Sequence, residues 1–406
     1  MTPSPRGWCP SLFEPMLSGD GLLLRIKPRA ARLDAAAARR LARASFLYGN
    51  GAVEITNRGN LQFRGFTAAT AALFAREAVA AGVATADPAA ERRRNILVSP
   101  LAGNDPECAG DTLEVARTLE AGLVMHQALD RLPAKFGFLV DGGGALGLGA
   151  TRADVALRAV AGGWRVEAGT AGLFCTAAKA ALLALHLART AQDAQPAMRP
   201  ARRPEAGPNL FEAAGLPWEP VATGAATVPV PVGPLPGRAF GIGLPPGRLD
   251  AALLASLATL AEECGDGTLR VTPWRALLLA GVRERGERML RAALPAELLD
   301  PGAPQLRTAC CIGGPGCANG SVPAAADAAR LGALVPPGQV LHVSGCAKGC
   351  GHPGPAALTL VGRDGTYDLV RNGRASDPPT LRGLTVDAAA DLLHPAARTP
   401  AGDYRA

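Results

Sequence analysis

Residues 21–66 read GLLLRIKPRAARLDAAAARRLARASFLYGNGAVEITNRGNLQFRGF. This pattern predicts a strand, an amphipathic helix that ends at Gly49 to Gly51, and two further strands on either side of the turn Asn57-Arg58-Gly59. Residues 238–282 follow the same order and read RAFGIGLPPGRLDAALLASLATLAEECGDGTLRVTPWRALLLAGV. Because Arg-Leu-Asp also recurs, at 32–34 and 248–250, we predict a duplicated α+β chain with a pseudo-twofold axis.

A segment rich in Pro, Ala and Gly separates the two similar halves. Residues 191–236 are predicted to form an irregular linker. In each half, the short repeat is followed by a longer segment of mixed helix and strand pattern, 86–190 in the first and 296–406 in the second. In a chain of this kind we expect a ligand to bind between the halves, where the two α/β units meet.

The composition is that of a folded globular protein, with 48% hydrophobic residues among 406. A formal net charge of +7 favours acidic partners, although an Arg-rich codon bias explains it equally well. Nucleic acid is poorly supported, because aromatic residues make up only 4% and none alternate with a basic run. No apolar run approaches the ~18 residues that span a bilayer. With no signal-peptide pattern visible either, we expect a cytoplasmic protein without a membrane partner.

Two cysteine pairs carry the strongest functional signal, in ACCIGGPGC (309–317) and SGCAKGCG (344–351). Four thiolates can hold a [4Fe–4S] cluster, and Gly-rich loops let backbone N–H groups approach its sulfides. Zinc is a weaker alternative, because the five residues between the first two ligands fit zinc motifs poorly. Uncoordinated thiols are the remaining one. The other cysteines are expected to be buried packing residues: Cys9, Cys108, Cys175, Cys264 and Cys310.

These motifs resemble those of the sulfite and nitrite reductase superfamily, which has the same C-x5-C and C-x3-C pairs and a duplicated arrangement. The resemblance runs over most of the chain. It implies two ferredoxin-like half-repeats, at 1–85 and 237–295, and two α/β units, at 86–190 and 296–406. It also implies a [4Fe–4S] cluster in the second unit, where Cys350 takes the position that bridges to sirohaem iron in the superfamily. The implied ligands are Cys311, Cys317, Cys346 and Cys350.

Three further segments resemble superfamily elements that contact macrocycle carboxylates and the small anion being reduced: TNRGNLQFRG (56–65), RRNILVSP (93–100) and LPAKF (132–136). Gly137 stands where the superfamily has a second Lys, which weakens the case for sulfite or nitrite as substrate. Lys348 replaces the usual Asn between the last two cysteines. The resemblance and the cationic chemistry together predict tetrapyrrole contacts from Thr56, Arg58, Gln62, Arg94, Asn95, Lys135 and Lys348.

Together with the opening RGWCPSLFEPMLSGDGLLLRI, these motifs are similar to those of the precorrin-3B synthase family of aerobic cobalamin synthesis. The similarity implies a tetrapyrrole monooxygenase that hydroxylates precorrin-3A and closes a γ-lactone, using dioxygen and electrons from an external reductase. The family is also described with a mononuclear non-haem iron, but no ligand spacing appears among the five His residues. The alternatives are a sirohaem-dependent sulfite or nitrite reductase, a non-enzymatic iron–sulfur carrier and a zinc-stabilised binding protein.

Residues 142–147, GGGALG, imitate a dinucleotide-binding fingerprint. The segment that follows has no helix start where the fingerprint requires one, and it is predicted to form a turn and a strand. We therefore do not predict nicotinamide binding there.

Overall fold

The computed structural model describes residues 10–149, 151–194, 198–221 and 228–393. The predicted strand–helix–strand–turn–strand order is confirmed in both half-repeats. The first contains β1 (Met16–Ser18), β2 (Gly21–Ile26), β3 (Arg32–Asp34), α1 (Ala35–Tyr48), β4 (Ala52–Ile55), β5 (Leu61–Phe66) and α2 (Ala68–Ala80). The second contains β12 (Gly233–Leu235), β13 (Ala239–Gly243), β14 (Arg248–Asp250), α7 (Ala251–Cys264), β15 (Thr268–Val271), β16 (Ala276–Leu279) and α8 (Glu284–Ala293).

The repeated Arg-Leu-Asp sequence forms a three-residue strand in each half, and its Asp is the N-cap of the main helix that follows. Asp34 accepts a hydrogen bond from the backbone N–H of Ala37 at 2.6 Å, and Asp250 accepts one from Leu253 at 2.7 Å. Such N-caps satisfy backbone donors that the first helical turn leaves unpaired. Gly49 and Gly265 end the two helices.

The two half-repeats exchange strands. One central sheet has the order β1-β2-β5-β4-β14 and the other has β12-β13-β16-β15-β3, so each half supplies its Arg-Leu-Asp strand to the other half's sheet. Helices α1 and α7 pack on these sheets over one continuous core, to which both halves contribute residues such as Leu41, Phe63, Leu254 and Leu277. The half-repeats therefore form one folding unit.

The duplication extends to the two α/β units. The first contains α3 (Pro88–Arg93), β6 (Ile96–Val98), α4 (Thr112–Met125), β7 (Phe138–Asp141), β8 (Val155–Val160), β9 (Gly163–Ala168), β10 (Ala171–Cys175) and α5 (Ala177–Asp193), with α6 (Ala206–Ala213) and β11 (Glu219–Pro220) added. The second contains β17 (Thr308–Cys310), α9 (Ala324–Gly332), β18 (Leu341–Ser344), β19 (Ala356–Arg363), β20 (Thr366–Gly373), β21 (Leu381–Leu384) and α10 (Val386–Leu393). In both sheets three parallel strands are followed by antiparallel ones.

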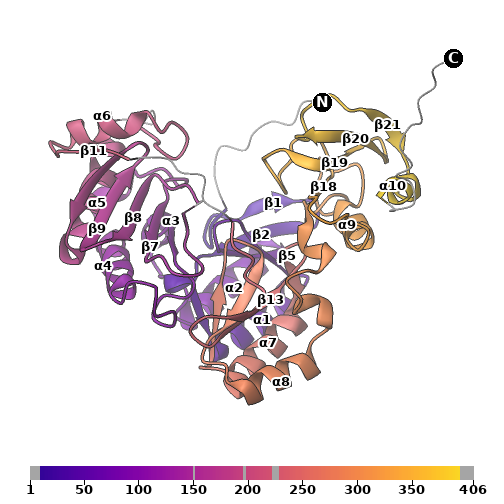
Figure 1. Cartoon of the computed structure of the whole chain (residues 1–406), viewed down its shortest axis with the longest axis horizontal. Coiled ribbons are helices and arrows are strands. Elements are labelled where there is room, and N and C mark those ends of the chain that lie inside the picture. The colour runs from indigo at the N-terminus through magenta and orange to yellow at the C-terminus, as the bar shows by residue number, and fades with distance from the viewer. Residues whose placement is uncertain (1–9, 150, 195–197, 222–227, 394–406) are drawn as a thin grey trace.

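Figure 1 shows how these parts are arranged. Helices α1, α7 and α8 lie below β1, β2 and β5 in this view, and one α/β unit lies to each side of these three strands. The helices cover the apolar face of the β1-β2-β5-β4-β14 sheet. Its other face, which we call the polar platform, carries Arg25, Glu54, Gln62, Arg64 and Arg248.

Two local expectations can be compared with the structure. Segment 191–236 is not simply an irregular linker, because it contains α6, whose Leu210 and Phe211 are fully buried in the core of the first α/β unit. Residues 142–147 form turns after β7, and the next regular element is strand β8, so the predicted turn and strand are confirmed. No helix in the described part of the chain is long and apolar enough to cross a membrane.

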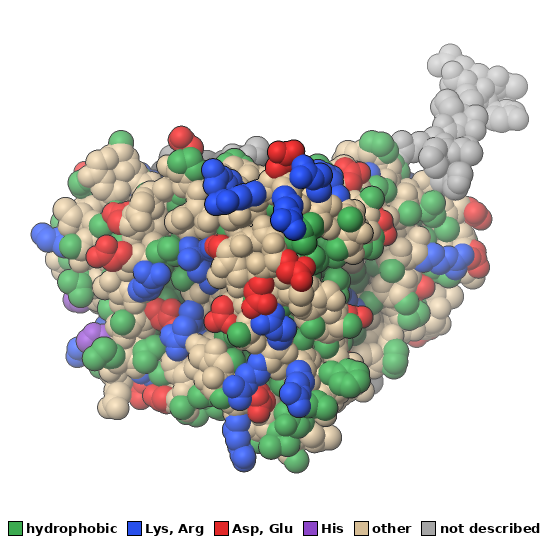
Figure 2. Space-filling model, turned by 90° about the horizontal axis from the view of Figure 1, so that it is seen from below, with side chains coloured by type: hydrophobic (Ala, Val, Ile, Leu, Met, Phe, Trp, Pro, Cys, Tyr) green, Lys and Arg blue, Asp and Glu red, His purple; other side chains and the backbone are tan. Residues whose placement is uncertain are grey.

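The helical face of the molecule carries mixed charges. In Figure 2, which views this face from below, basic and acidic side chains lie beside one another. Helices α1, α2, α7 and α8 also carry the ion pairs Arg39–Glu262, Arg40–Glu77 and Arg291–Glu287. The net positive charge of the chain is therefore not concentrated on this face.

Candidate active site

A polar row crosses four strands of the platform. Arg25 on β2 lies opposite Gln62 on β5, which lies opposite Glu54 on β4, which in turn lies opposite Arg248 on β14. Arg25 donates to Gln62 at 2.9 Å, and Gln62 donates to Glu54 at 2.6 Å. Arg248 pairs with the other oxygen of Glu54 at 2.7 Å. The row fixes these side chains relative to one another, as paired neighbours on a sheet do.

The equivalent row on the other central sheet is covered by the first α/β unit. There the positions of Arg25 and Gln62 are taken by Gly241 and Leu278. Leu278 is fully buried and packs with Leu101 and Leu146 of the first α/β unit. The positions of Glu54 and Arg248 are taken by Arg270 and Arg32, and Arg270 is buried and donates to Asn104 and Asp266.

A cationic cavity lies at the β2 end of the platform. Its lining includes Arg25, Lys27, Arg58, Arg92 and Asn95. A second hollow shares Arg58 and Asn95 with it and extends along Gly137 to Arg152. Thr56 shapes the turn that presents Arg58, because its hydroxyl accepts hydrogen bonds from the N–H groups of Arg58 (3.3 Å) and Asn60 (3.1 Å).

Gly137 provides space for Arg58 in this cavity. A Cβ atom on Gly137 would lie 2.9 Å from an Nη atom of Arg58 and 3.2 Å from the amide nitrogen of Asn95. Arg58 also donates to the backbone oxygen of Lys135 at 3.4 Å, and Asn95 donates to that of Phe136 at 3.0 Å. The absence of a side chain at position 137 thus lets the two predicted contact residues occupy one site.

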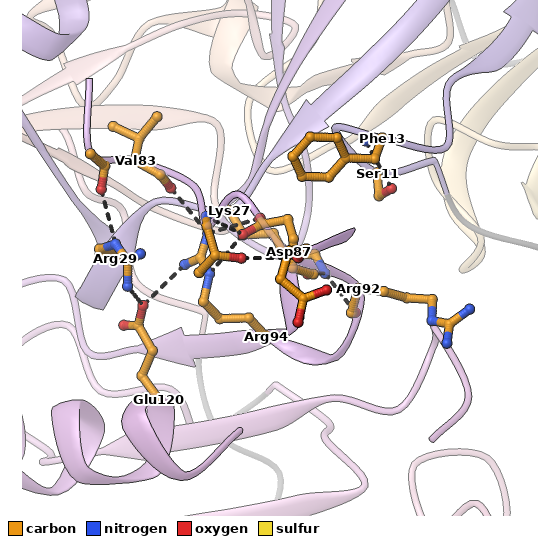
Figure 3. Close-up of polar contacts among 12 residues, drawn as sticks. Ser11, Phe13, Lys27, Arg29, Val83, Asp87, Arg92, Arg94 and Glu120 are labelled. Atoms are coloured by element: carbon orange, nitrogen blue, oxygen red, sulfur yellow. Dashed lines mark hydrogen bonds and ion pairs between the residues drawn. The ribbon is translucent and has the colours of Figure 1, made fainter. Parts of the chain in front are cut away.

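Arg94 is buried and bonded to other residues of the protein, whereas the sequence predicted that it contacts the tetrapyrrole. It is 2% exposed and donates to both carboxylate oxygens of Glu91, at 2.8 and 3.0 Å, and to the carbonyl of Val83. Figure 3 shows Arg29 and Arg94 reaching Glu120 from two sides. Since these partners occupy its guanidinium group, we do not include Arg94 among the proposed substrate contacts.

Removing Arg94 is expected to destabilise the fold. Arg94→Ala leaves the fully buried carboxylate of Glu91 without its cation, which costs about 3–5 kcal/mol. Urea unfolding of the purified variant measures the loss. In a control, Arg131→Ala removes the exposed pair with Asp193 and should change stability little. Normal stability with weakened substrate binding would restore the predicted contact role.

The two cysteine loops meet beside the other end of the polar row. The backbone N–H of Gly345 donates to the sulfur of Cys311 at 3.1 Å, and that of Ser321 donates to the carbonyl of Gly345. A Cβ on Gly345 would lie 2.9 Å from the Cα of Gly313, so only glycine permits this approach. Arg275 ties the loops to the second half-repeat by donating to the carbonyls of Thr308 and Gly351.

The thiols of Cys311, Cys317 and Cys346 lie within electrostatic range of Cys350. Burial raises the pKa of Cys350, and negative charge on Cys311, Cys346 and Cys317 raises it further, while Lys348 opposes them. Among the described residues, no three His, Cys, Asp or Glu side chains are close enough to hold one metal ion. A cubane does not require such convergence, because each thiolate binds a different iron atom. Donor chemistry, loop contacts and glycine spacing therefore fit a [4Fe–4S] cluster.

The remaining described cysteines pack in cores, as expected: Cys108, Cys175, Cys264 and Cys310 are buried. Burial raises the pKa of Cys310 to about 12, so it stays a thiol. Cys9 lies outside the described residues. Arg275 links the β14 end of the polar row to the cysteine loops, because its side chain packs against Gly247, next to Arg248, and donates to the carbonyl of Gly351, next to Cys350.

His342 is a fully buried histidine on β18. Among the described residues neither ring nitrogen has a hydrogen-bond partner, and its ring meets that of His352 edge-on at 5.7 Å. Burial, together with the charges of His352 and Arg275, lowers the pKa of His342 to about 4. In the folded protein at neutral pH this histidine is therefore uncharged.

The stability of the protein should consequently depend on pH through His342. The pKa of His342 in the folded protein lies below the ordinary value of 6.5. Stability is therefore unaffected by this histidine above pH 6.5, and it falls as the pH drops from 6.5 through 4, because the unfolded chain then binds a proton that the folded one does not. We expect Tm to fall less steeply over that window in His342→Gln than in the parent protein. The matched control, exposed His186→Gln, should follow the parent curve. Parallel curves for all three proteins would contradict the assignment.

Comparison with known proteins settles the family. The Nitrite/Sulfite reductase ferredoxin-like half domain matches residues 14–81 and 235–294, which are the two strand-exchanged half-repeats. A curated precorrin-3B synthase from Sinorhizobium sp is 33% identical over 404 residues, covering 92% of this chain and 84% of that protein. The chain belongs to the precorrin-3B synthase family. This confirms the resemblance drawn from the motifs and makes the protein an oxidoreductase.

A solved structure supports the fold of this precorrin-3B synthase family member. The Mycobacterium tuberculosis NirA protein matches it with a TM-score of 0.69 at 17% identity, over 92% of this chain and 79% of that one. The duplicated α+β architecture is thereby confirmed as that of the nitrite and sulfite reductase superfamily.

Several site residues were missed by the sequence analysis. Arg25 and Lys27 line the cavity, and Arg64, Arg248 and Arg275 lie along the platform or contact the cysteine loops. Strand alternation contained a usable signal for Arg25 and Arg64, because both face away from the apolar side of their strands. The predicted Gln62 belongs to the polar row, and Lys348 is exposed beside Cys350.

Proposed function

We propose that this protein is a precorrin-3B synthase, a monooxygenase that hydroxylates precorrin-3A and closes the γ-lactone of precorrin-3B. The observation that carries the proposal is the polar row itself. Arg25, at one end of the row, lines a cationic cavity, and Arg248, at the other end, follows Gly247, which packs against Arg275, a residue that contacts the cysteine loops. Three interstrand spacings separate Arg25 from Arg248, or roughly 14 Å at ~4.8 Å each. A platform of this width suits a flat macrocycle with carboxylates at its edge.

In this proposal Cys311, Cys317, Cys346 and Cys350 hold a [4Fe–4S] cluster. When bound, the cluster supplies single electrons, which an external reductase would provide. Lys348 is exposed, and Cys350 is exposed as a residue although its thiol is partly desolvated, which supports the approach of a donor to this site. The described residues give no basis for assigning ligands to an additional mononuclear iron.

The cavity residues would bind the substrate and fix its orientation. Arg58 presents a planar guanidinium to a carboxylate, and Asn95 adds an amide donor beside it. Arg25 and Gln62 would hold carboxylates along the platform, while Glu54 keeps Gln62 and Arg248 in place. We also propose that Lys135 and Lys348 contact carboxylates at the edge of the macrocycle. Positioning the macrocycle in this way would leave one of its faces open to dioxygen.

Spectroscopy and turnover together test the proposal. Anaerobically purified protein should contain iron and sulfide, show cluster signals in optical and EPR spectra, and show no sirohaem bands. With precorrin-3A, dioxygen and a chemical reductant, mass spectrometry should detect precorrin-3B. Sirohaem bands with sulfite or nitrite reduction would instead support the reductase alternative. Zinc without iron would reject both activities.

A further inference from the structure

The carbonyl oxygen of Gly316, next to Cys317, accepts hydrogen bonds from three donors. They are the backbone N–H of Gly19 at 3.0 Å, the hydroxyl of Ser18 at 2.6 Å and a guanidinium nitrogen of Arg64 at 2.9 Å. A carbonyl oxygen has two lone pairs, so three donors exceed its usual complement. All three come from the first half-repeat, far away in the chain: Ser18 is 298 positions from Gly316, and Arg64 is 252 positions from it.

The turn between β1 and β2 packs backbone against backbone on this loop. A Cβ on Gly19 would lie 2.1 Å from the carbonyl oxygen of Pro315 and 3.0 Å from the backbone nitrogen of Cys317. Any side chain at position 19 would therefore push the turn away from the loop. This contact is independent of the hydrogen bonds and places the β1–β2 turn directly against a proposed cluster ligand.

Arg64 brings a buried positive charge to the same place. It is 2% exposed and pairs with both oxygens of Asp20 at 2.8 Å, with Glu54 further away at 3.5 Å. Burial lowers the pKa of Arg64, but the hydrogen bond to Asp20 and the charges of Glu54, Asp20 and Cys317 outweigh it and raise the pKa above its ordinary value. Arg64 therefore remains charged beside Cys317 at any working pH.

We propose that Arg64, with Ser18 and Gly19, positions Cys317 and sets the reduction potential of the cluster. The inference rests on the cluster assignment made above. Net charge and hydrogen bonding around a cluster tune its potential, and reduction adds a negative charge. Replacing Arg64 with a neutral residue removes a cation and leaves Asp20 without the guanidinium group that pairs with it, so reduction becomes harder. Arg64 is a positioning residue, since it acts through Gly316 and through its charge.

Redox titration of the full-length holoprotein, followed by EPR, tests this role. We expect the midpoint potential of Arg64→Gln to shift to more negative values, and that of Ser18→Ala to shift less in the same direction. Arg93→Gln is the matched control. Arg93 is also a buried arginine that donates to backbone carbonyls, but it lies in the first α/β unit. The cluster of Arg93→Gln should therefore have the same midpoint potential as that of the parent protein.

Iron and sulfide content separates the possible outcomes. A full cluster with parental potential in both Arg64→Gln and Ser18→Ala would overturn this inference and leave the proposed function intact. A parent protein without any cluster would refute both. If Arg64→Gln fails to fold, Arg64→Lys and Ser18→Ala carry the test. The lysine keeps the charge but loses the paired contact with Asp20, so a parental EPR line shape and potential in both of these variants would reject positioning.

Discussion

Replacing Cys346 with serine is expected to abolish the iron–sulfur signal and turnover together. A serine oxygen is a poor substitute for a thiolate in a cubane, and Cys346 leads the second of the two loops that meet at the site. The loss should be complete within detection, because electrons then have no route to the substrate. Iron analysis, EPR and single-turnover formation of precorrin-3B measure the two effects separately.

A neighbouring cysteine provides the control for this variant. Cys310→Ala removes a buried thiol adjacent to Cys311 that packs in the core of the second α/β unit. We expect it to retain the cluster and its activity, with a modest loss of stability. Turnover by Cys346→Ser in the absence of a cluster would show that the cluster does not deliver electrons.

Introducing a side chain at Gly137 should produce the second largest effect. In Gly137→Lys, the new Cβ lies where Arg58 and Asn95 now approach, so the added side chain displaces both, and its ammonium group repels the guanidinium group of Arg58. Displacing a charge-assisted contact costs about 1.5–3 kcal/mol, or roughly a 10- to 100-fold loss of affinity. Equilibrium binding of precorrin-3A to the anaerobic protein measures the change, and Arg58→Ala should weaken binding to a similar degree.

Gly110→Ala is the matched glycine control. Gly110 lies in the same α/β unit and has no heavy atom within 4 Å of its ideal Cβ position, so a methyl group there has space. Its affinity for precorrin-3A should match the parent. If Gly137→Lys and Arg58→Ala also bind like the parent, the cavity does not bind the substrate.

The order of the elements could be predicted from the sequence because the repeats contain strong local signals. Alternating apolar residues define β2 and β5, and Asp34, Asp250 and their C-terminal glycines bound the long helices. The strand exchange could not be predicted. Strands β3 and β14 have three residues each, and their partners are determined by packing between distant parts of the chain.

The candidate site shows the same division between local and distant information. Motif spacing gave the four cysteines, and the structure places their loops together. One partner of Arg94 is Glu120, which is 26 residues away in the chain. Neither this contact nor the burial of Arg94 can be predicted from a motif. Likewise Arg64 faces Gly316, which is 252 residues distant. Motif resemblance supplies the identity of a side chain, whereas its neighbours come from the tertiary fold.

The exchange of β3 and β14 has a consequence for synthesis on the ribosome. Until residues 248–250 have emerged, strand β4 has no outer neighbour and remains an open edge that can pair with another nascent chain. A translation product that stops within 191–236 would keep that edge permanently. Such truncated chains should associate or be degraded, so a split gene for this protein would require both fragments to be made together.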